Sequence, residues 1–299
     1  KEVSGSDLGE SQTTNLLKEK GVKIYIGHKG ENIPEETDLV VYSDAVKEDN
    51  VERVRAKELK IEQKSYFKAL GEFANQYELV AVSGTHGKTT TTAMIIDVFE
   101  EAGLDPMGVV GSLRAKTKSN FRSGKGKYFI AEADEYMRHF LQFQPKILVI
   151  TNIEADHLDY YKDLDDVQSA FRELARKVPR DGSIVCNPHD ENVKPVLNGV
   201  SASIIDYKRL GSSSEFALKV FGKHNRNNAE VALAVSSVAE IDHKVAMEAL
   251  NKFSGTWRRF DYKGALTTGS FLYDDYAHHP TEIMATLNGA REAYPKKNI

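Results

Sequence analysis

The feature that most constrains this chain is an apolar run that leads into a glycine-rich loop and then into a helical pattern. Residues 78–83 (Glu-Leu-Val-Ala-Val-Ser) predict a buried strand, and the loop at 84–90 (Gly-Thr-His-Gly-Lys-Thr-Thr) follows directly. Apolar residues at helical spacing then predict a helix over 89–102, with Gly103 as the residue that ends it. A strand, a loop and a helix in this order are typical of a parallel α/β sheet.

The loop itself predicts binding of a nucleoside triphosphate. Its glycines let backbone N–H groups turn towards an anion, and the helix N-terminus adds partial positive charge. Lys88 can reach the β- and γ-phosphates, and the hydroxyl of Thr89 can bind Mg²⁺. The alternative is an ordinary strand–helix turn with a solvated lysine, and the strict motif is missed because Val82 stands where it requires glycine. The order of strand, loop and helix favours nucleotide binding.

Composition excludes several classes of protein. The net charge of −4 argues against a nucleic-acid-binding surface, which would normally be basic. No run approaches the roughly 18 apolar residues of a membrane span. The one cysteine, Cys186, cannot form an internal disulfide, which favours a reducing, cytoplasmic location. Its apolar surroundings predict a small buried hydrophobic residue.

Strand-like and helical segments alternate along the chain, which predicts α/β architecture with mostly parallel sheets. Further strands are expected at 22–26, 39–42, 127–131, 146–153, 183–186 and 270–273. Further helices are expected at 164–177, 222–240 and about 280–293. A chain of 299 residues is long enough for two domains and part of a third.

Polar side chains follow two of the predicted strands downstream of the loop. Glu132, Asp134 and Glu135 come after the first strand, and Asn152 and His157 follow the second. Carboxylates at the end of a parallel strand, near a phosphate loop, are expected to be metal ligands. Taken alone, an acidic cluster is more often a solvated turn, and a single histidine is more often a surface or core residue.

Three later motifs carry further polar residues. Asn225 and Asn228 open an alanine-rich helix, where asparagine can pair with an adenine edge or simply cap the helix. Arg259 lies among aromatic residues and could stack at a solvated edge. The adjacent His278 and His279 do not predict zinc, because neighbouring residues rarely bind one ion together and no cysteine accompanies them.

Taken in order, these motifs resemble those of the Mur ligases. The loop at 84–90 is similar to the shortened ATP loop of that family, so Val82 supports the family and counts against other P-loop NTPases. The later runs EADE, TNIEADHLD, HNRNNA, GTWRRF and DDYAHHPTE are also similar to family motifs. The resemblance implies an ATP- and Mg²⁺-dependent ligase that joins L-alanine to UDP-N-acetylmuramate through an acyl phosphate, in peptidoglycan precursor synthesis.

The resemblance also implies roles for individual residues. ATP contacts are implied for Gly84, Thr85, His86, Gly87, Lys88, Thr89, Thr90, His224, Asn225, Asn228, Arg259 and Asp275. Catalytic roles are implied for Lys88, Glu132, His157, Arg259 and His279, and substrate contacts for Asn152, Ser6 and Asp7. Thr89, Glu132 and His157 would hold Mg²⁺, with Glu135 in place of Glu132 if the acidic loop has another register.

By the same resemblance the chain divides into three parts. Residues 1–72 would be a partial Rossmann-like domain for the UDP substrate, and 73–258 the central ATP-binding domain. Residues 259–299 would begin a truncated Rossmann-like third domain for the amino acid. The family's UDP loop would precede Lys1, and most of its third domain would follow Ile299. This polypeptide is therefore expected to bind ATP weakly and not to ligate.

Three alternatives stay open. Tyr136 stands where the family commonly has serine, so a sister ligase that adds another amino acid or a recycled muropeptide is one of them. The second alternative is a P-loop kinase that transfers phosphate to a stable acceptor. Release of free phosphate that requires an amine would exclude a kinase. The third is a nucleotide-binding module without ligase activity. The carbamylated lysine of several Mur ligases is not expected, because Ala-Phe-Arg occupies 170–172.

Overall fold

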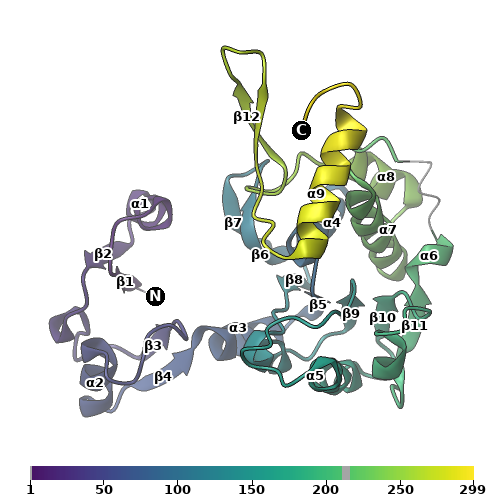
Figure 1. The fold of residues 1–299 in the computed structure, drawn as a ribbon. Coiled ribbons are helices and arrows are strands. Elements are labelled where there is room, and N and C mark those ends of the chain that lie inside the picture. Colours follow the sequence, from purple (N-terminus) through teal and green to yellow (C-terminus); the bar gives the residue numbers. More distant parts are fainter. Residues whose placement is uncertain (1, 211–215) are drawn as a thin grey trace. The chain divides into compact units, whose positions relative to one another are not determined.

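The computed structural model describes residues 2–210 and 216–299, and the chain forms two compact units, Lys1–Leu70 and Gly71–Ile299 (Figure 1). The second unit holds the glycine-rich loop. Among the described residues, no helix has both the length and the hydropathy needed to cross a lipid bilayer.

The first unit is built from short elements that form two separate parallel sheets. Its elements are β1 (Ser4–Asp7), α1 (Gln12–Glu19), β2 (Lys23–Ile26), η1 (Gly30–Asn32), β3 (Leu39–Tyr42), α2 (Val51–Glu58), β4 (Glu62–Ser65) and α3 (Tyr66–Ala74). Strand β1 pairs with β2, and β3 pairs with β4, both in parallel. The two pairs form separate sheets, and the connection from β2 to β3 contains the short 3₁₀ helix η1.

The second unit is organised around a seven-stranded sheet. Its elements before the C-terminal segment are β5 (Glu78–Ser83), α4 (Lys88–Glu101), β6 (Met107–Arg114), β7 (Ser119–Arg122), β8 (Tyr128–Glu132), η2 (Tyr136–Gln142), β9 (Ile147–Ile150), α5 (Leu164–Arg176), β10 (Ser183–Cys186), η3 (Lys194–Leu197), β11 (Ser203–Asp206), α6 (Tyr207–Leu210), α7 (Lys223–Val238) and α8 (His243–Lys252). The strand order is β11-β10-β9-β5-β8-β6-β7, and only the β6–β7 pair is antiparallel. Strand β5 therefore carries the glycine-rich loop at the middle of a mostly parallel sheet.

Helices cover both faces of this sheet, and its central strands are apolar throughout. Figure 1 shows α4, α7 and α8 on one face and α5 on the opposite face. Helix α4 is enclosed between the sheet and α7 and α8, so its residues Met94, Ile95, Val98 and Phe99 are fully buried. Burial on all sides explains why β5 and β9 read as continuous apolar runs rather than alternating ones.

The ends of the elements next to the loop follow from local chemistry. Gly87 occupies the N-cap of α4 with a left-handed φ of 85°, and Gly103 follows its C-cap with φ 72°. Strand β9 is shorter than the expected 146–153, ending at Ile150. The reason is that Thr151 and Asn152 leave the sheet to hydrogen-bond the loop after β5.

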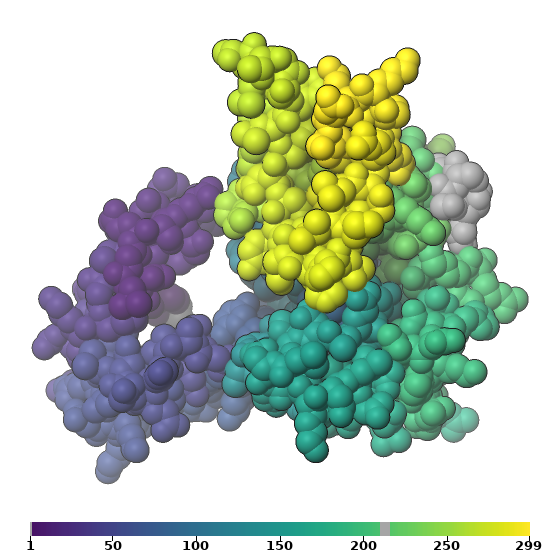
Figure 2. All heavy atoms as spheres, viewed as in Figure 1, coloured from purple at the N-terminus to yellow at the C-terminus, as the bar shows by residue number. Residues whose placement is uncertain are grey.

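The C-terminal segment stands on the same unit. It comprises an antiparallel hairpin of β12 (Asp261–Ala265) and β13 (Phe271–Asp274), followed by α9 (Pro280–Ala293). Phe260 stacks on Tyr273 with ring centroids 4.4 Å apart, which ties the hairpin to the chain that leads into it. Figure 2 shows this segment, in yellow and yellow-green, against the teal and green atoms of the central sheet and its helices.

Candidate active site

The glycine-rich loop encloses a space that side chains larger than glycine would fill. A Cβ atom on Gly84, whose φ is 134°, would lie 2.0 Å from the Thr151 hydroxyl oxygen. A Cβ on Gly87 would lie 2.7 Å from the Asn228 side-chain oxygen. Both glycines are therefore required by close approach as well as by backbone conformation.

Two residues that follow β9 hold the glycine-rich loop in place through hydrogen bonds to His86. Asn152 accepts a hydrogen bond from the His86 N–H at 2.9 Å and donates one to the His86 carbonyl at 3.0 Å. Thr151 donates its hydroxyl to the same carbonyl at 2.6 Å. The structure thus gives Asn152 a contact with the phosphate loop, and its expected contact with a substrate stays a prediction.

Lys88 is partly buried at the first position of α4 and faces a carboxylate. Its Nζ donates to the carbonyls of Gly84 and Thr85, at 2.7 and 3.2 Å, and lies 2.9 Å from the Glu135 carboxylate. Burial opposes the charged lysine, yet Glu135 and Glu132 hold the pKa of Lys88 above its usual value. Burial likewise raises the pKa of Glu135, which is only 2% exposed.

Glu132 and Thr89 meet beside the loop, as the sequence anticipates for two ligands of one cation. One oxygen of Glu132 accepts the Thr89 hydroxyl at 3.0 Å, and the other accepts the backbone N–H of Gly111 at 2.7 Å. Two oxygen donors are the kind of ligand that Mg²⁺ prefers. Whether they share an ion stays a prediction.

The structure groups His157 with Glu135 rather than with Glu132. Its Nε2 lies 3.7 Å from the Glu135 carboxylate. Ligand atoms of Asp134, Glu135 and His157 all lie within 4.8 Å of one another. The Tyr136 ring lies 4.9 Å from the imidazole and its hydroxyl donates to Asp159, so this loop fixes His157 from the side. His157 thus lies near Glu135, and which of the two glutamates binds a cation stays a prediction.

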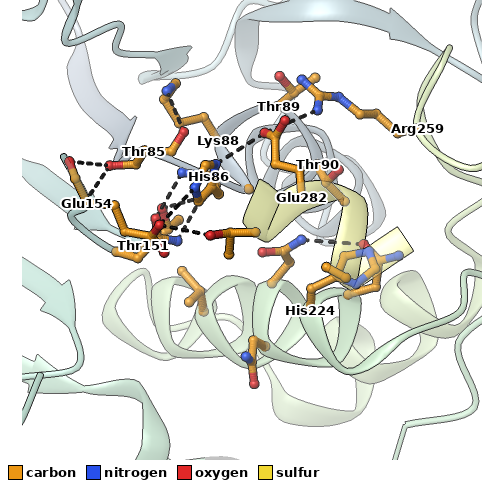
Figure 3. Close-up of a pocket in the computed structure, with 18 of the residues that line it drawn as sticks. Thr85, His86, Lys88, Thr89, Thr90, Thr151, Glu154, His224, Arg259 and Glu282 are labelled. Carbon is orange, nitrogen blue, oxygen red and sulfur yellow. Dashed lines mark hydrogen bonds and ion pairs between the residues drawn. The ribbon is translucent and has the colours of Figure 1, made fainter. Parts of the chain in front are cut away.

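A cavity of about 390 Å³ opens over the loop (Figure 3). Residues expected to contact ATP that line it are Thr85, His86, Gly87, Lys88, Thr89, Thr90, His224, Asn225, Asn228, Arg259 and Asp275. Glu132 and Asn152 also line it, whereas Gly84, His157 and His279 are not among its lining residues. The cavity therefore gathers residues from the loop, from α7 and from the C-terminal segment.

The residues expected at the base and ribose lie at the far end of this cavity. His224 is largely buried, and burial lowers the pKa of its imidazole. Asn225 donates to the Phe221 carbonyl at 2.7 Å, and no side chain caps α7, whose N-cap is Gly222. Capping is thus not the role of these asparagines. The Asp275 carboxylate accepts two backbone N–H groups, from Phe260 and Ala277, which fixes it at the rim.

His279 caps α9 and lies beside the phosphate loop. Its Nδ1 accepts the N–H of Thr281 at 3.3 Å, and its ring centroid lies 4.9 Å from that of His86. Ligand atoms of His86, Glu154 and His279 lie within 4.8 Å of one another, so His279 meets groups from other elements rather than its neighbour His278.

Ser6 and Asp7 lie in the first unit, where the structure gives them different surroundings. Ser6 donates to the buried Glu52 carboxylate at 2.6 Å, and His28 lies 2.9 Å from the same oxygen. Asp7 is exposed and accepts the N–H of Gly9. Their expected contact with a UDP substrate stays a prediction.

Known proteins match almost the whole chain. The Mur ligase family catalytic-domain model matches residues 1–78, and the Mur ligase middle-domain model matches residues 82–211. The UDP-N-acetylmuramate–L-alanine ligase of Clostridium botulinum (strain Loch Maree / Type A3) is 40% identical over 323 residues, covering 99% of this chain and 70% of the relative.

The chain belongs to the Mur ligase family.

Solved structures agree with this Mur ligase in fold. The UDP-N-acetylmuramate-alanine ligase of Thermotoga maritima has a TM-score of 0.83 at 29% identity, over 99% of this chain and 73% of that one. A murein peptide ligase of Psychrobacter arcticus has a TM-score of 0.82 at 26% identity, over 99% and 72%. The expected α/β fold with a mostly parallel central sheet is confirmed.

Several residues that line the cavity of this Mur ligase were not singled out in the sequence. They are Glu154, Asn187, Asp190, Tyr207, Lys208, Asn227, Val231, Thr281, Glu282, Ala285 and Thr286. Glu154 and Glu282 stand inside motifs already noted, so their motif membership was the available signal. Asn187 and Lys208 follow strands β10 and β11, and the rule that ligands bind at the carboxyl ends of parallel strands could have found them.

Replacing Gly84 by alanine in this Mur ligase tests the loop directly. The added Cβ would clash with Thr151 and strain the backbone, at a combined cost of about 2–5 kcal/mol. We expect ATP affinity, measured by calorimetry, to fall at least about tenfold. Gly103→Ala is the control, since its φ is also positive but no atom lies within 4 Å of the added Cβ. Unchanged ATP affinity in Gly84→Ala would contradict the loop's role.

Proposed function

We propose that the full-length gene product that contains this chain joins L-alanine to UDP-N-acetylmuramate and converts ATP to ADP and phosphate. The similarity that carries the proposal is to relatives named UDP-N-acetylmuramate–L-alanine ligase, at 40% identity over 99% of the chain. The cavity supports it, because Lys88, Thr89, Glu132 and Arg259 converge on one space.

The single Cys186 thiol is buried, and burial raises its pKa to about 12, in keeping with action in a reducing cytoplasm.

Thr89 and Glu132 fit a hard cation. Their oxygens lie 3.0 Å apart at the wall of the cavity, and both are of the type that Mg²⁺ takes as ligands. They would hold the ion, with His157 and Glu135 as the neighbouring candidates. When bound there, Mg²⁺ would neutralise charge on the β- and γ-phosphate oxygens.

The reaction has two steps, and the residues of this chain position and neutralise rather than attack. A substrate carboxylate oxygen attacks the γ-phosphorus, the bond to the bridging oxygen breaks, and ADP leaves an acyl phosphate behind. The L-alanine amine then attacks the acyl carbon, phosphate leaves, and loss of a proton from nitrogen completes the amide. Lys88 and Arg259 stabilise the negative charge of the transferring phosphoryl group.

Lys88 must change partners for this chemistry. Its Nζ contacts Glu135 and two loop carbonyls in this structure. Phosphate oxygens would compete for the same three donors of the ammonium group. We therefore infer that Lys88 moves from Glu135 to the phosphates as ATP binds, and that Glu135 holds the lysine in the cavity until then.

A sister ligase is the second candidate, because Tyr136 lies beside His157 and the murein peptide ligase of Psychrobacter arcticus has nearly the same TM-score as the alanine ligase. Phosphate release by the full-length gene product, with ATP, Mg²⁺, UDP-N-acetylmuramate and one amine at a time, separates the two. We expect release with L-alanine and little with L-alanyl-γ-D-glutamyl-meso-diaminopimelate. The reverse order would overturn the assignment, and release without any amine would indicate an ATPase.

A further inference from the structure

Two side chains in the first turn of α9, Thr281 and Glu282, connect this helix to the phosphate loop and to the segment after β9. The proposed reaction assigns neither of them a role. His86 Nδ1 lies 3.2 Å from Glu282 Oε1, and His86 Nε2 lies 3.5 Å from Glu154 Oε2. Thr281 donates its hydroxyl to the same Glu154 oxygen at 3.0 Å. One imidazole on the loop is thus held between two carboxylates, one from α9 and one from the segment after β9 (Figure 3).

Glu282 also faces the arginine of the cavity. The Arg259 guanidinium lies 3.9 Å from the same Oε1 that meets His86. The other oxygen accepts the backbone N–H of His278 at 3.2 Å, which fixes the carboxylate in this orientation. Glu282 is therefore a single anion shared by a loop residue and by the arginine expected at the γ-phosphate.

The two carboxylates beside His86 favour its protonated form. Two unneutralised carboxylates at the wall of a polyphosphate cavity would repel the nucleotide. Burial lowers the pKa of His86, but Glu282 and Glu154 outweigh it and raise the pKa above the ordinary 6.5. Burial likewise opposes ionisation of Glu282, yet His86, the His278 N–H and Arg259 bring its pKa down to about 2. The His279 ring lies beside the same imidazole, with ring centroids 4.9 Å apart in a tilted arrangement.

We propose that Glu282 is a positioning residue for phosphoryl transfer, which holds His86 and Arg259 in one arrangement and so sets the phosphate loop against α9. The proposal rests on the proposed function for its catalytic readout. Glu282 does not need to touch the nucleotide for this role. It acts on the loop through His86 and on the transferring phosphoryl group through Arg259.

The sign of the pH dependence follows from the two shifts. A histidine whose pKa is raised in the folded state contributes below its ordinary value, and the contribution is lost as pH rises through the raised pKa. Glu282, with a lowered pKa, stays ionised until the pH falls towards about 2. The contribution of the His86–Glu282 contact is therefore fully present below pH 6.5 and is lost as the pH rises through the raised pKa of His86.

The test compares Glu282→Gln with Glu292→Gln in the full-length gene product. Glu292 also anchors α9, through Arg226 on α7 at 2.5 and 3.1 Å, but it does not touch the phosphate loop. We expect Glu282→Gln to lower kcat about 10- to 100-fold with a smaller change in the KM for ATP. In the pH profile of kcat, the fall in rate on the alkaline side should occur at a lower pH in Glu282→Gln than in the wild type. Glu292→Gln should keep the wild-type kcat and pH profile.

An NMR titration of the His86 ring supplies a readout that does not depend on turnover. The midpoint should lie above 6.5 in the wild type and in Glu292→Gln, and fall in Glu282→Gln. An unchanged midpoint and kcat in Glu282→Gln, or an equal loss in Glu292→Gln, would overturn the proposal. If the wild type ligates no amine, the proposed function fails, and the His86 midpoint together with ATP affinity still decides whether Glu282 holds the loop.

Discussion

Replacing Lys88 by methionine is expected to lower kcat for phosphate release about 10³-fold. Methionine keeps the length and the apolar stem of the side chain but cannot neutralise charge on the transferring phosphoryl group. Turnover of the full-length gene product with all three substrates measures the effect. Lys88→Arg should recover little, because the guanidinium fork does not fit the place of a compact ammonium between two carbonyls and Glu135.

Lys88→Met should also change the stability of the fold. This effect separates the pairing of Lys88 with Glu135 from its action on the transferring phosphoryl group. Without its partner, the buried Glu135 carboxylate would cost about 3 kcal/mol or more if it stayed charged. Because burial already raises the pKa of Glu135, the carboxyl takes up a proton instead, and the variant loses stability as pH rises. Denaturant unfolding at several pH values measures this.

The double variant Lys88→Met, Glu135→Gln is the control. It should regain stability at neutral pH, because no unpaired charge remains, and it should stay as inactive as Lys88→Met. Recovery of activity in the double variant would mean that Lys88 serves only to balance Glu135.

Replacing Glu132 by glutamine is expected to lower kcat about 10²-fold and to raise the Mg²⁺ concentration needed for half-maximal rate. Glutamine keeps the shape of the side chain but removes the charge beside Thr89. It can accept only one of the two hydrogen bonds that Thr89 and Gly111 now donate. A Mg²⁺ titration of phosphate release measures both effects.

Glu135→Gln is the matched control for this experiment. Its carboxylate lies on Lys88 and near His157, so the variant should change ATP affinity with little effect on the Mg²⁺ titration. A larger shift of the Mg²⁺ midpoint in Glu135→Gln than in Glu132→Gln would move the cation to the cluster of Asp134, Glu135 and His157.

The phosphate loop and its flanking elements were predictable from sequence because local signals and the tertiary structure agree there. β5 matches the expected 78–83, and α4 begins one residue before the expected 89. A hydrophobic run also located β10, since buried parallel strands are apolar along their whole length. The run at 39–42 located β3 as well, although Leu39 and Val41 are exposed there. The alternating burial of β6 gives a much weaker pattern, so the antiparallel edge made by β6 and β7 was not anticipated.

The site was predictable as a set of motifs but not as a set of contacts. The sequence motifs suggested that Glu132 and His157 share one site. In the structure the Thr89 hydroxyl donates to Glu132, whereas His157 lies near Glu135. The strained turn after β8, where Met137 and Arg138 both have positive φ, decides which carboxylate faces which partner. Backbone conformations of this kind leave no periodic signal in the sequence.

Contacts between distant segments were also beyond the sequence. Glu282 lies 196 residues from His86, and no spacing rule connects a helix start with a phosphate loop at that separation. The Glu282–His86–Glu154 contact depends on how α9 packs over the cavity, which is a property of the folded unit.

A crystal structure of the full-length gene product with Mg²⁺ and a non-hydrolysable ATP analogue tests the central claim most directly. We expect the terminal phosphates to lie in the loop of residues 84–90, with Lys88 in contact with them rather than with Glu135. We also expect Thr89 and Glu132 to bind the cation. A nucleotide bound elsewhere, with Lys88 still on Glu135, would contradict this claim.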